Sequence, residues 1–264
     1  MNIPQVSEQF GALMEANGKQ MGQGSVFSLT LAKVKSIDDK DKLNRVRCLP
    51  ITAKDNELTD WCYVMTPMSG PDRGLFMFPQ VDDLVVLGYL GNDPHNPIVL
   101  GGFWCADSKP PVAISDGKAE DYCLKTPNKV ALELHDEDKK QKMTITMPSG
   151  TVIEIDDDKQ TVTTKNKGGD TSMLMKMKDG EIELKAKSKL TLAVGNASVV
   201  LESNGNITIK GTGGSVSIEG NEFSGKAQSS LAMQGANASV KGNASLSLES
   251  SGTAILKGSL LKLN

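Results

Sequence analysis

The sequence predicts an all-β protein in which a small closed barrel precedes a long β-helix completed by three copies of the chain. Three observations predict it. Only 4% of the 264 residues are aromatic, short runs alternate between apolar and polar residues, and beyond Ile209 apolar pairs recur every seven or eight residues. Because aromatic side chains supply much of the apolar area of ordinary cores, a chain with so few must bury its surface in thin, repeated layers.

A short N-terminal helix is predicted within residues 1–24. Val6, Phe10, Leu13 and Met14 lie at spacings of four, three and one, which places them on one face of a helix, and several glycines follow. That face could pack on the rest of its own domain or dock onto a neighbouring protein. Both alternatives stay open, and the four residues are the candidates for contact with a hub protein.

Residues 25–106 alternate in the manner of a small closed sheet. Five strand regions are expected, and they are bounded by turn residues such as those at 38–41. The regions are residues 25–37, 43–50, 60–66, 75–79 leading into 84–90, and 97–104. Five strands in about 80 residues fit an OB-type barrel. Residues 107–128 contain Pro110, Pro111 and Pro127 and are predicted to be an extended connector.

Residues 129–264 are predicted to form the shaft of the molecule. Each short unit offers one apolar face, and Gly or Asn between units permits a bend before the next strand. The candidate core residues of the shaft are Ile207, Ile209, Val216, Ile218, Leu231, Met233, Val240, Leu246, Leu248, Leu256, Leu261 and Leu263. A unit of eight residues covers only one side of a closed cross-section, whereas a single-chain β-helix needs more residues per coil.

Three identical chains give the simplest closure, a triangular prism whose interwound walls share a narrow apolar interior. Burying two such side chains gains on the order of 3 to 6 kcal/mol, whereas ordering about eight residues costs roughly 1 to 2 kcal/mol each. One chain alone therefore cannot order this segment. Two alternatives are a disordered tail rich in Gly and Ser and a flat antiparallel meander, which would expose its edges.

Charge and side-chain chemistry argue against several functions. A formal net charge of −3 with mixed signs offers no basic field for nucleic acid. No stretch reaches the roughly 20 apolar residues of a membrane span, so assembly in the cytoplasm is expected.

The four cysteines lack metal-site spacing and are expected to be buried free thiols. His95 and His135 have no nucleophile nearby in sequence, and the acidic clusters 136–138 and 156–158 favour solvated turns. We expect no catalytic residue, no metal and no cofactor.

A resemblance covers more than half of the chain. The segment PQVDDLVVLGYLGNDPHNPIVLGGFW, residues 79–104, resembles the signature of the phage baseplate assembly protein V family, which shares its OB-fold spike domain with the valine-glycine repeat spikes of type VI secretion. The matching motif residues are Pro79, Asp83, Gly91, Asp93, Pro94, Pro97 and Gly101. Residues 128–158 resemble the start of the family's β-helix. Asp82 replaces the usual Gly, which is tolerable because Asp adopts the left-handed region better than most residues.

The resemblance implies a central spike at the tip of a contractile tail, with a separate hub protein at its N-terminal end. The C-terminal residues lack the His-x-His pair that binds iron in self-tipped relatives, so a separate PAAR-type cap would sit on Leu260, Leu261, Lys262, Leu263 and Asn264. The alternative is a β-helical fibre or tailspike that binds a surface polysaccharide. Such proteins expose aromatic platforms, whereas Phe223 is the only aromatic residue beyond Val130.

Overall fold

The computed structural model describes residues 29–53, 56–114 and 116–262. These residues form β-strands with one short 3-10 turn, η1 (Leu90–Asn92), which confirms the all-β prediction. The helix expected around Val6, Phe10, Leu13 and Met14 lies outside the described residues, as do Leu263 and Asn264. The chain divides into two compact units, Met1–Lys187 and Ser188–Asn264.

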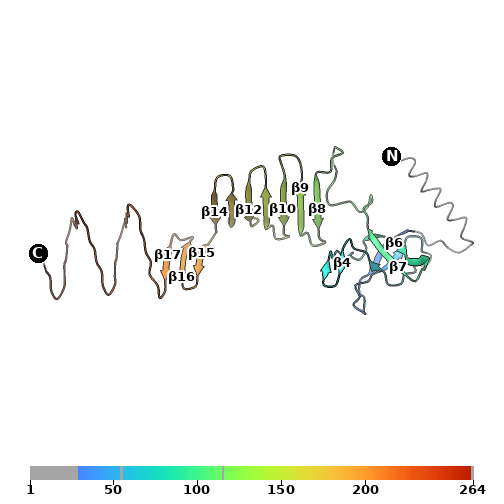
Figure 1. Ribbon diagram of the computed structural model, residues 1–264, viewed down its shortest axis with the longest axis horizontal. Coiled ribbons are helices and arrows are strands. Elements are labelled where there is room, and N and C mark those ends of the chain that lie inside the picture. The colour runs from blue at the N-terminus through green and yellow to red at the C-terminus, as the bar shows by residue number, and fades with distance from the viewer. Residues whose placement is uncertain (1–28, 54–55, 115, 263–264) are drawn as a thin grey trace, which may run out of the picture. The chain divides into compact units, whose positions relative to one another are not determined.

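Five strands form the barrel of the first unit (Figure 1). They are β1 (Thr30–Ser36), β2 (Arg47–Pro50), β3 (Tyr63–Val64), β6 (Leu84–Tyr89) and β7 (Pro97–Gly102). The sheet order is β2-β1-β6-β7-β3, and β3 runs parallel to β7. An antiparallel bridge between Val46 and Cys62 joins the two ends of this order and closes the sheet. A closed five-stranded sheet with these connections is an OB-fold barrel.

Small side chains fill the barrel because every second residue of its strands points inward. The fully buried set is Ala32, Val34, Val46, Cys48, Cys62, Val85, Leu87 and Val99. All four cysteines are free, but Cys105 and Cys123 are only half-buried, so the prediction of buried thiols holds for Cys48 and Cys62 alone.

The prediction of a strand at 75–79 is wrong. A small hairpin, β4 (Ser69–Gly70) with β5 (Arg73–Gly74), precedes this run, and the run itself is irregular. Strand β6 already pairs with β1 on one side and β7 on the other, so no edge of the barrel is left for another strand. The side chain of Phe76 is 74% exposed.

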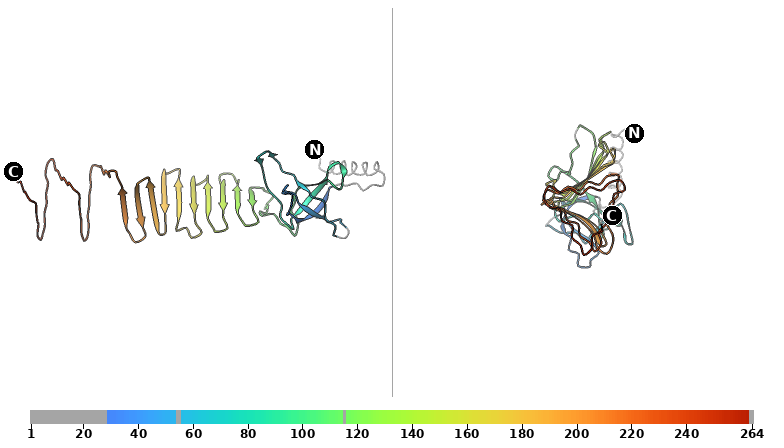
Figure 2. Two further views of the ribbon diagram at one scale, coloured as in Figure 1. Left: turned by 90° about the horizontal axis from the view of Figure 1, so that it is seen from below. Right: turned by 90° about the vertical axis from the view of Figure 1, so that its left-hand side faces the viewer.

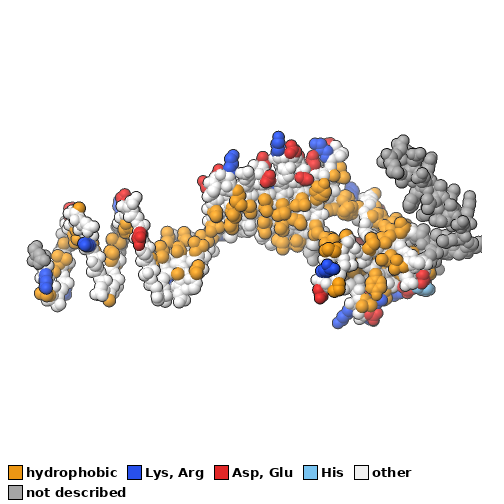
Figure 3. Space-filling model, in the orientation of Figure 1, with side chains coloured by type: hydrophobic (Ala, Val, Ile, Leu, Met, Phe, Trp, Pro, Cys, Tyr) orange, Lys and Arg blue, Asp and Glu red, His pale blue; other side chains and the backbone are white. Residues whose placement is uncertain are grey.

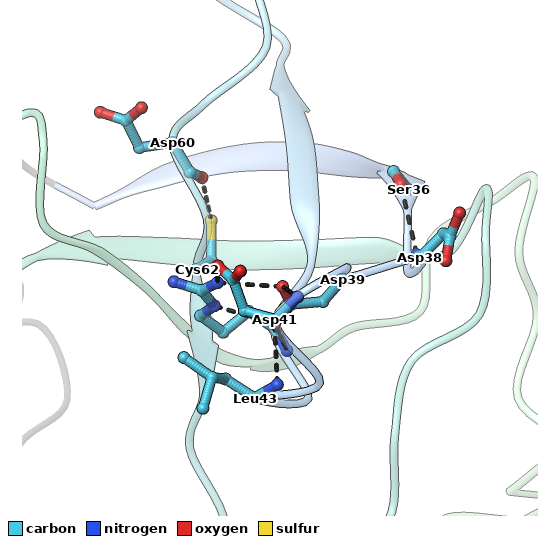
Figure 4. A network of polar contacts seen from close by, with 8 residues as sticks. Ser36, Asp38, Asp39, Asp41, Leu43, Asp60 and Cys62 are labelled. Carbon is cyan, nitrogen blue, oxygen red and sulfur yellow. Dashed lines mark hydrogen bonds and ion pairs between the residues drawn. The ribbon is translucent and has the colours of Figure 1, made fainter.

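The turn between β1 and β2 is held by a buried carboxylate (Figure 4). Asp39 accepts hydrogen bonds from the backbone N–H groups of Asp41 and Leu43, and the guanidinium of Arg45 donates two more at 2.9 Å. The hydrogen bond from Arg45 is the main cause that lowers the pKa of Asp39 far below its ordinary value. This fixed turn sets the register between β1 and β2.

Seven strands form an antiparallel sheet in which each strand pairs with the next one along the chain (Figures 1 and 2). They are β8 (Asp121–Lys125), β9 (Ala131–His135), β10 (Lys142–Thr146), β11 (Val152–Asp156), β12 (Thr161–Lys165), β13 (Ser172–Lys176) and β14 (Glu181–Lys185). Within one chain the pairing is that of a meander, and this succession of antiparallel strands fits one wall of a β-helix. Strand β8 lies inside the segment expected as a connector, because Tyr122 and Leu124 alternate with polar residues and pair with β9.

The second unit begins with a three-stranded antiparallel sheet and continues without strands. The strands are β15 (Lys189–Val194), β16 (Ala197–Glu202) and β17 (Ile207–Gly211). From Thr212 to Lys262 the described chain forms no strand, and its one backbone-to-backbone hydrogen bond runs from the N–H of Thr212 to the carbonyl of Asn196. Its residues are exposed throughout.

Candidate functional site: an uncovered apolar face

Two parallel rows of apolar side chains cross the seven-stranded sheet from β8 to β14. Because side chains alternate between the faces of a strand, residues that pair in register line up in rows across the sheet. The first row is Tyr122, Leu134, Met143, Ile155, Val162, Met175 and Ile182. The second row is Leu124, Leu132, Ile145, Ile153, Thr164, Met173 and Leu184. We call these fourteen positions the apolar face, and Thr164 is the one polar residue on it.

The apolar face is uncovered in a single chain, and Figure 3 shows its side chains as a continuous band. Eight of its apolar side chains are exposed, including Ile155 at 39% and Ile182 at 65%. Continuous apolar surfaces of this extent are uncommon on monomeric soluble proteins and mark interaction sites. Sequence analysis placed the shaft core beyond Ile207 and missed this face as a site, although the alternating runs that build it were visible.

The opposite face of the sheet is polar and carries ion pairs along one margin. Asp156 is 4% exposed, and it pairs with Lys142 at 3.3 Å and with Lys159 at 2.9 Å. The backbone N–H of Lys159 also donates to its carboxylate, and this bond is the main cause that lowers the pKa of Asp156 from 3.8 to about 2. The described sheet therefore carries its charged groups on one face and its apolar rows on the other.

In the second unit the predicted core residues lie where no part of the described chain covers them. Ile207 and Ile209 belong to β17, Leu263 lies outside the described residues, and the others follow in the strandless segment. Their side chains are exposed over more than half of their surface, up to 83% for Met233.

The residues that carry the family resemblance hold the turn between β6 and β7. Gly91 adopts a positive φ of 64° inside η1. Asp93 accepts hydrogen bonds from the backbone N–H of His95 at 2.9 Å and from the side chain of Asn96 at 2.6 Å. The backbone N–H of Leu90 donates to the carbonyl of Asn96 and closes the loop. These residues therefore shape the barrel.

The remaining motif residues also lie on the barrel. Pro97 is buried at the start of β7, Gly101 lies in the same strand, and Pro79 precedes the turn at which Asp83 accepts the N–H of Gln80. Pro94 is exposed beside Asp93. Asp82 has a φ of 73°, which confirms the expected left-handed conformation, and Lys35 contacts its carboxylate at 3.1 Å.

The two histidines each pair with a carboxylate. His95 Nδ1 lies 2.8 Å from Asp60, and His135 Nδ1 lies 2.7 Å from Asp121, with Glu137 at 3.5 Å from its Nε2. These hydrogen bonds are the main cause that raises the pKa of each histidine. No group of three or more metal-ligating side chains was found among the described residues. Nor do those residues include a helix long and apolar enough to cross a membrane.

Residues 30–104 match the family model described as the type VI secretion system/phage-baseplate injector OB domain. The match covers all five strands of the observed barrel and the turn between β6 and β7. No curated protein matches the chain. The barrel therefore resembles the injector OB domain of phage baseplates and type VI secretion systems, which supports a role related to a phage baseplate or a type VI secretion injector.

Proposed function

We propose that this member of the baseplate assembly protein V family is the central spike of a contractile injection system. In this proposal three copies form a needle that joins the tube hub to a tip cap, and contraction of the tail drives the needle through the target envelope. The observation that carries the proposal is the uncovered apolar face, which adjoins in sequence the injector OB domain.

The energy of covering the apolar face supports obligate association. Fully burying a large apolar side chain stabilises a protein by about 1.5 to 3 kcal/mol. Thirteen such side chains, already roughly half-buried, still offer on the order of 10 kcal/mol per chain. This gain is comparable with the 4 to 15 kcal/mol lost in translational and rotational freedom on association.

The strandless segment supports closure by interwound chains. Buried backbone N–H and C=O groups need hydrogen-bond partners, and the described residues from 213 to 262 form no backbone-to-backbone hydrogen bond with one another. Strands from other copies, lying between successive passes of the chain, would pair with this backbone and cover Val216, Ile218, Leu246 and Leu256. Two sheets packed face to face would cover side chains but would leave this backbone unpaired.

The orientation of the spike follows from the order of its parts. The OB domain would lie at the hub or tube end, with Val6, Phe10, Leu13 and Met14 as candidate hub contacts. The other end, residues 260–264, would carry a PAAR-type cap. In this proposal the protein acts mechanically and catalyses no reaction, binds no nucleic acid, contacts the envelope only during penetration, and assembles in the cytoplasm into a phage tail-like particle.

Sedimentation velocity and native mass spectrometry of the full chain test the oligomeric state. The expected species is about three times the 28.1 kDa mass of the chain. A folded monomer or a dimer would contradict the prism. Electron microscopy of the assembled particle, with a label fused to the C-terminus, would then show whether that end lies at the tip.

A further inference from the structure

The strand ends and turns of the seven-stranded sheet lie along its two opposite sides, which differ in the charges that are left unpaired. The strands end alternately at one edge or the other, so the turns after β8, β10 and β12 share one edge and the turns after β9, β11 and β13 share the opposite one. We call the first the lysine edge and the second the aspartate edge.

The lysine edge carries unpaired positive charge. Lys125, Lys129, Lys165 and Lys167 lie at its strand ends and turns, and none of them forms an ion pair or side-chain hydrogen bond among the described residues. The acid in these turns, Asp170, is occupied by Lys187 at 3.0 Å and by Asn166 at 2.7 Å. The aliphatic part of the Lys167 side chain lies close to Gly150. A Cβ atom added to Gly150 would lie 2.7 Å from the Cβ atom of Lys167.

The aspartate edge carries the opposite excess. Its lysines at 140, 142, 159 and 176 are engaged by acids of the same edge. Five acids stay unpaired among the described residues, against the two lysines Lys139 and Lys178. The five are Asp136, Asp138, Asp157, Asp158 and Asp179.

We propose that the lysine edge of each chain meets the aspartate edge of the next copy at the three corners of the prism. The inference rests on the proposed trimer and identifies the surface that orders its chains. In a closed ring every contact is heterologous, so opposite edges of neighbouring walls meet. Opposite edges of this sheet carry opposite charge, and the occupant that fits both is a second copy of this chain.

The axial positions of the charges agree with this pairing. The turn that carries Lys167 follows β12, and the turns that carry Asp158 and Asp179 precede β12 and follow β13. In a ring without axial offset, these acids of the neighbouring chain lie about one strand spacing, roughly 4.8 Å, above and below the lysine. A lysine side chain spans that separation.

Charge reversal at one corner tests the proposal in the full chain. The first variant carries Lys165→Glu with Lys167→Glu, the second carries Asp157→Lys with Asp158→Lys, and the third combines all four substitutions. The control reverses Lys40 and Lys42 in the OB-domain turn to Glu, with the same change of net charge as the first variant. The readout is the rate of trimer recovery after dilution from denaturant, followed by sedimentation, with circular dichroism reporting strand content.

At about 10 mM salt, where the Debye length is roughly 30 Å, each single-edge variant should recover trimer at least about tenfold more slowly than the control. The combined variant should recover near the wild-type rate, and all differences should shrink at 1 M salt. Single-edge variants as fast as the control, or a combined variant as slow as either, would overturn the pairing while leaving the trimer intact. A wild-type chain that never trimerises would instead overturn the proposed function.

Discussion

The substitution Val162→Asp is the most direct test of the apolar face. Val162 lies in the first apolar row, with Ile155 and Met175 as its register partners on β11 and β13. Thr163, the next residue, points to the polar face and has nearly the same shape. Val162→Asp and Thr163→Asp therefore put the same poor strand former into the same strand, on opposite faces.

The proposed trimer sets the size of the effect. An uncompensated buried charge destabilises a protein by about 3 to 5 kcal/mol, and aspartate is too short to carry its carboxylate out of the interior. Three copies meet in one layer, so Val162→Asp should destabilise the trimer by about 10 to 15 kcal/mol. That loss is comparable with the net free energy of association, because the burial gain of about 10 kcal/mol per chain is largely offset by the cost of association. Thr163→Asp leaves its charge in water and should change stability by less than about 1 kcal/mol.

Sedimentation velocity across a dilution series measures the result, and tryptophan fluorescence of Trp61 and Trp104 checks that the barrel stays folded. Val162→Asp should sediment as a monomer with a folded OB domain, and Thr163→Asp as a trimer. If Val162→Asp were trimeric with wild-type thermal stability, the apolar face would not be an interior.

Three further predictions concern single residues. Because the pKa of Asp156 is lower in the folded state, its ion pairs should stabilise the protein above pH 3.8 and lose that effect as pH falls toward about 2; thermal melts of Asp156→Asn should lack this acid-dependent component. The pKa of His135 is raised, so its pairing with Asp121 should stabilise below the ordinary pKa of 6.5 and fade as pH rises through the raised value; melts of His135→Gln at pH 6 and pH 9 should show a smaller difference than wild type. Asp82→Gly should leave denaturant stability within about 1 kcal/mol of wild type, because relief of the positive φ offsets the lost lysine contacts, whereas Asp82→Val should lower it by about 1 to 2 kcal/mol.

Local patterns predicted the strands well because alternation and turn residues act over a few residues. The barrel strands around Val34, Val85 and Val99 follow the predicted order, and the left-handed Asp82 was expected from its type. The run at 75–79 shows the limit of such patterns. Its side chains suit a strand, but a strand needs a free edge to pair with, and only the complete barrel reveals that none is left.

The pairing partner of a strand is decided by the rest of the fold and not by the run itself. For this reason the sequence pattern did not predict which runs pair within the chain. The runs VALEL (130–134) and SVSIE (215–219) look alike in sequence, yet residues 131–134 of the first pair within the chain and residues 215–219 do not. The charged edges were missed for a similar reason. Lys167 and Asp158 both belong to polar turns, and only the alternation of strand direction sorts them to opposite sides of the sheet.

The scarcity of aromatic residues has a geometric explanation in the proposed prism. Each layer of the interior is about 4.8 Å high, the spacing of neighbouring strands, and receives side chains from three walls at once. Three aromatic rings in one such layer would overfill it, whereas Val, Ile, Leu and Met fit together. Of the eleven aromatic residues, only Tyr122 and Phe223 lie beyond residue 120. Tyr122 belongs to β8, the first strand of the sheet, where a neighbouring layer is missing on one side and a ring can be accommodated. A second aromatic residue in a middle strand, such as Ile153→Phe on β11, should therefore weaken the trimer through overpacking, although it adds apolar surface.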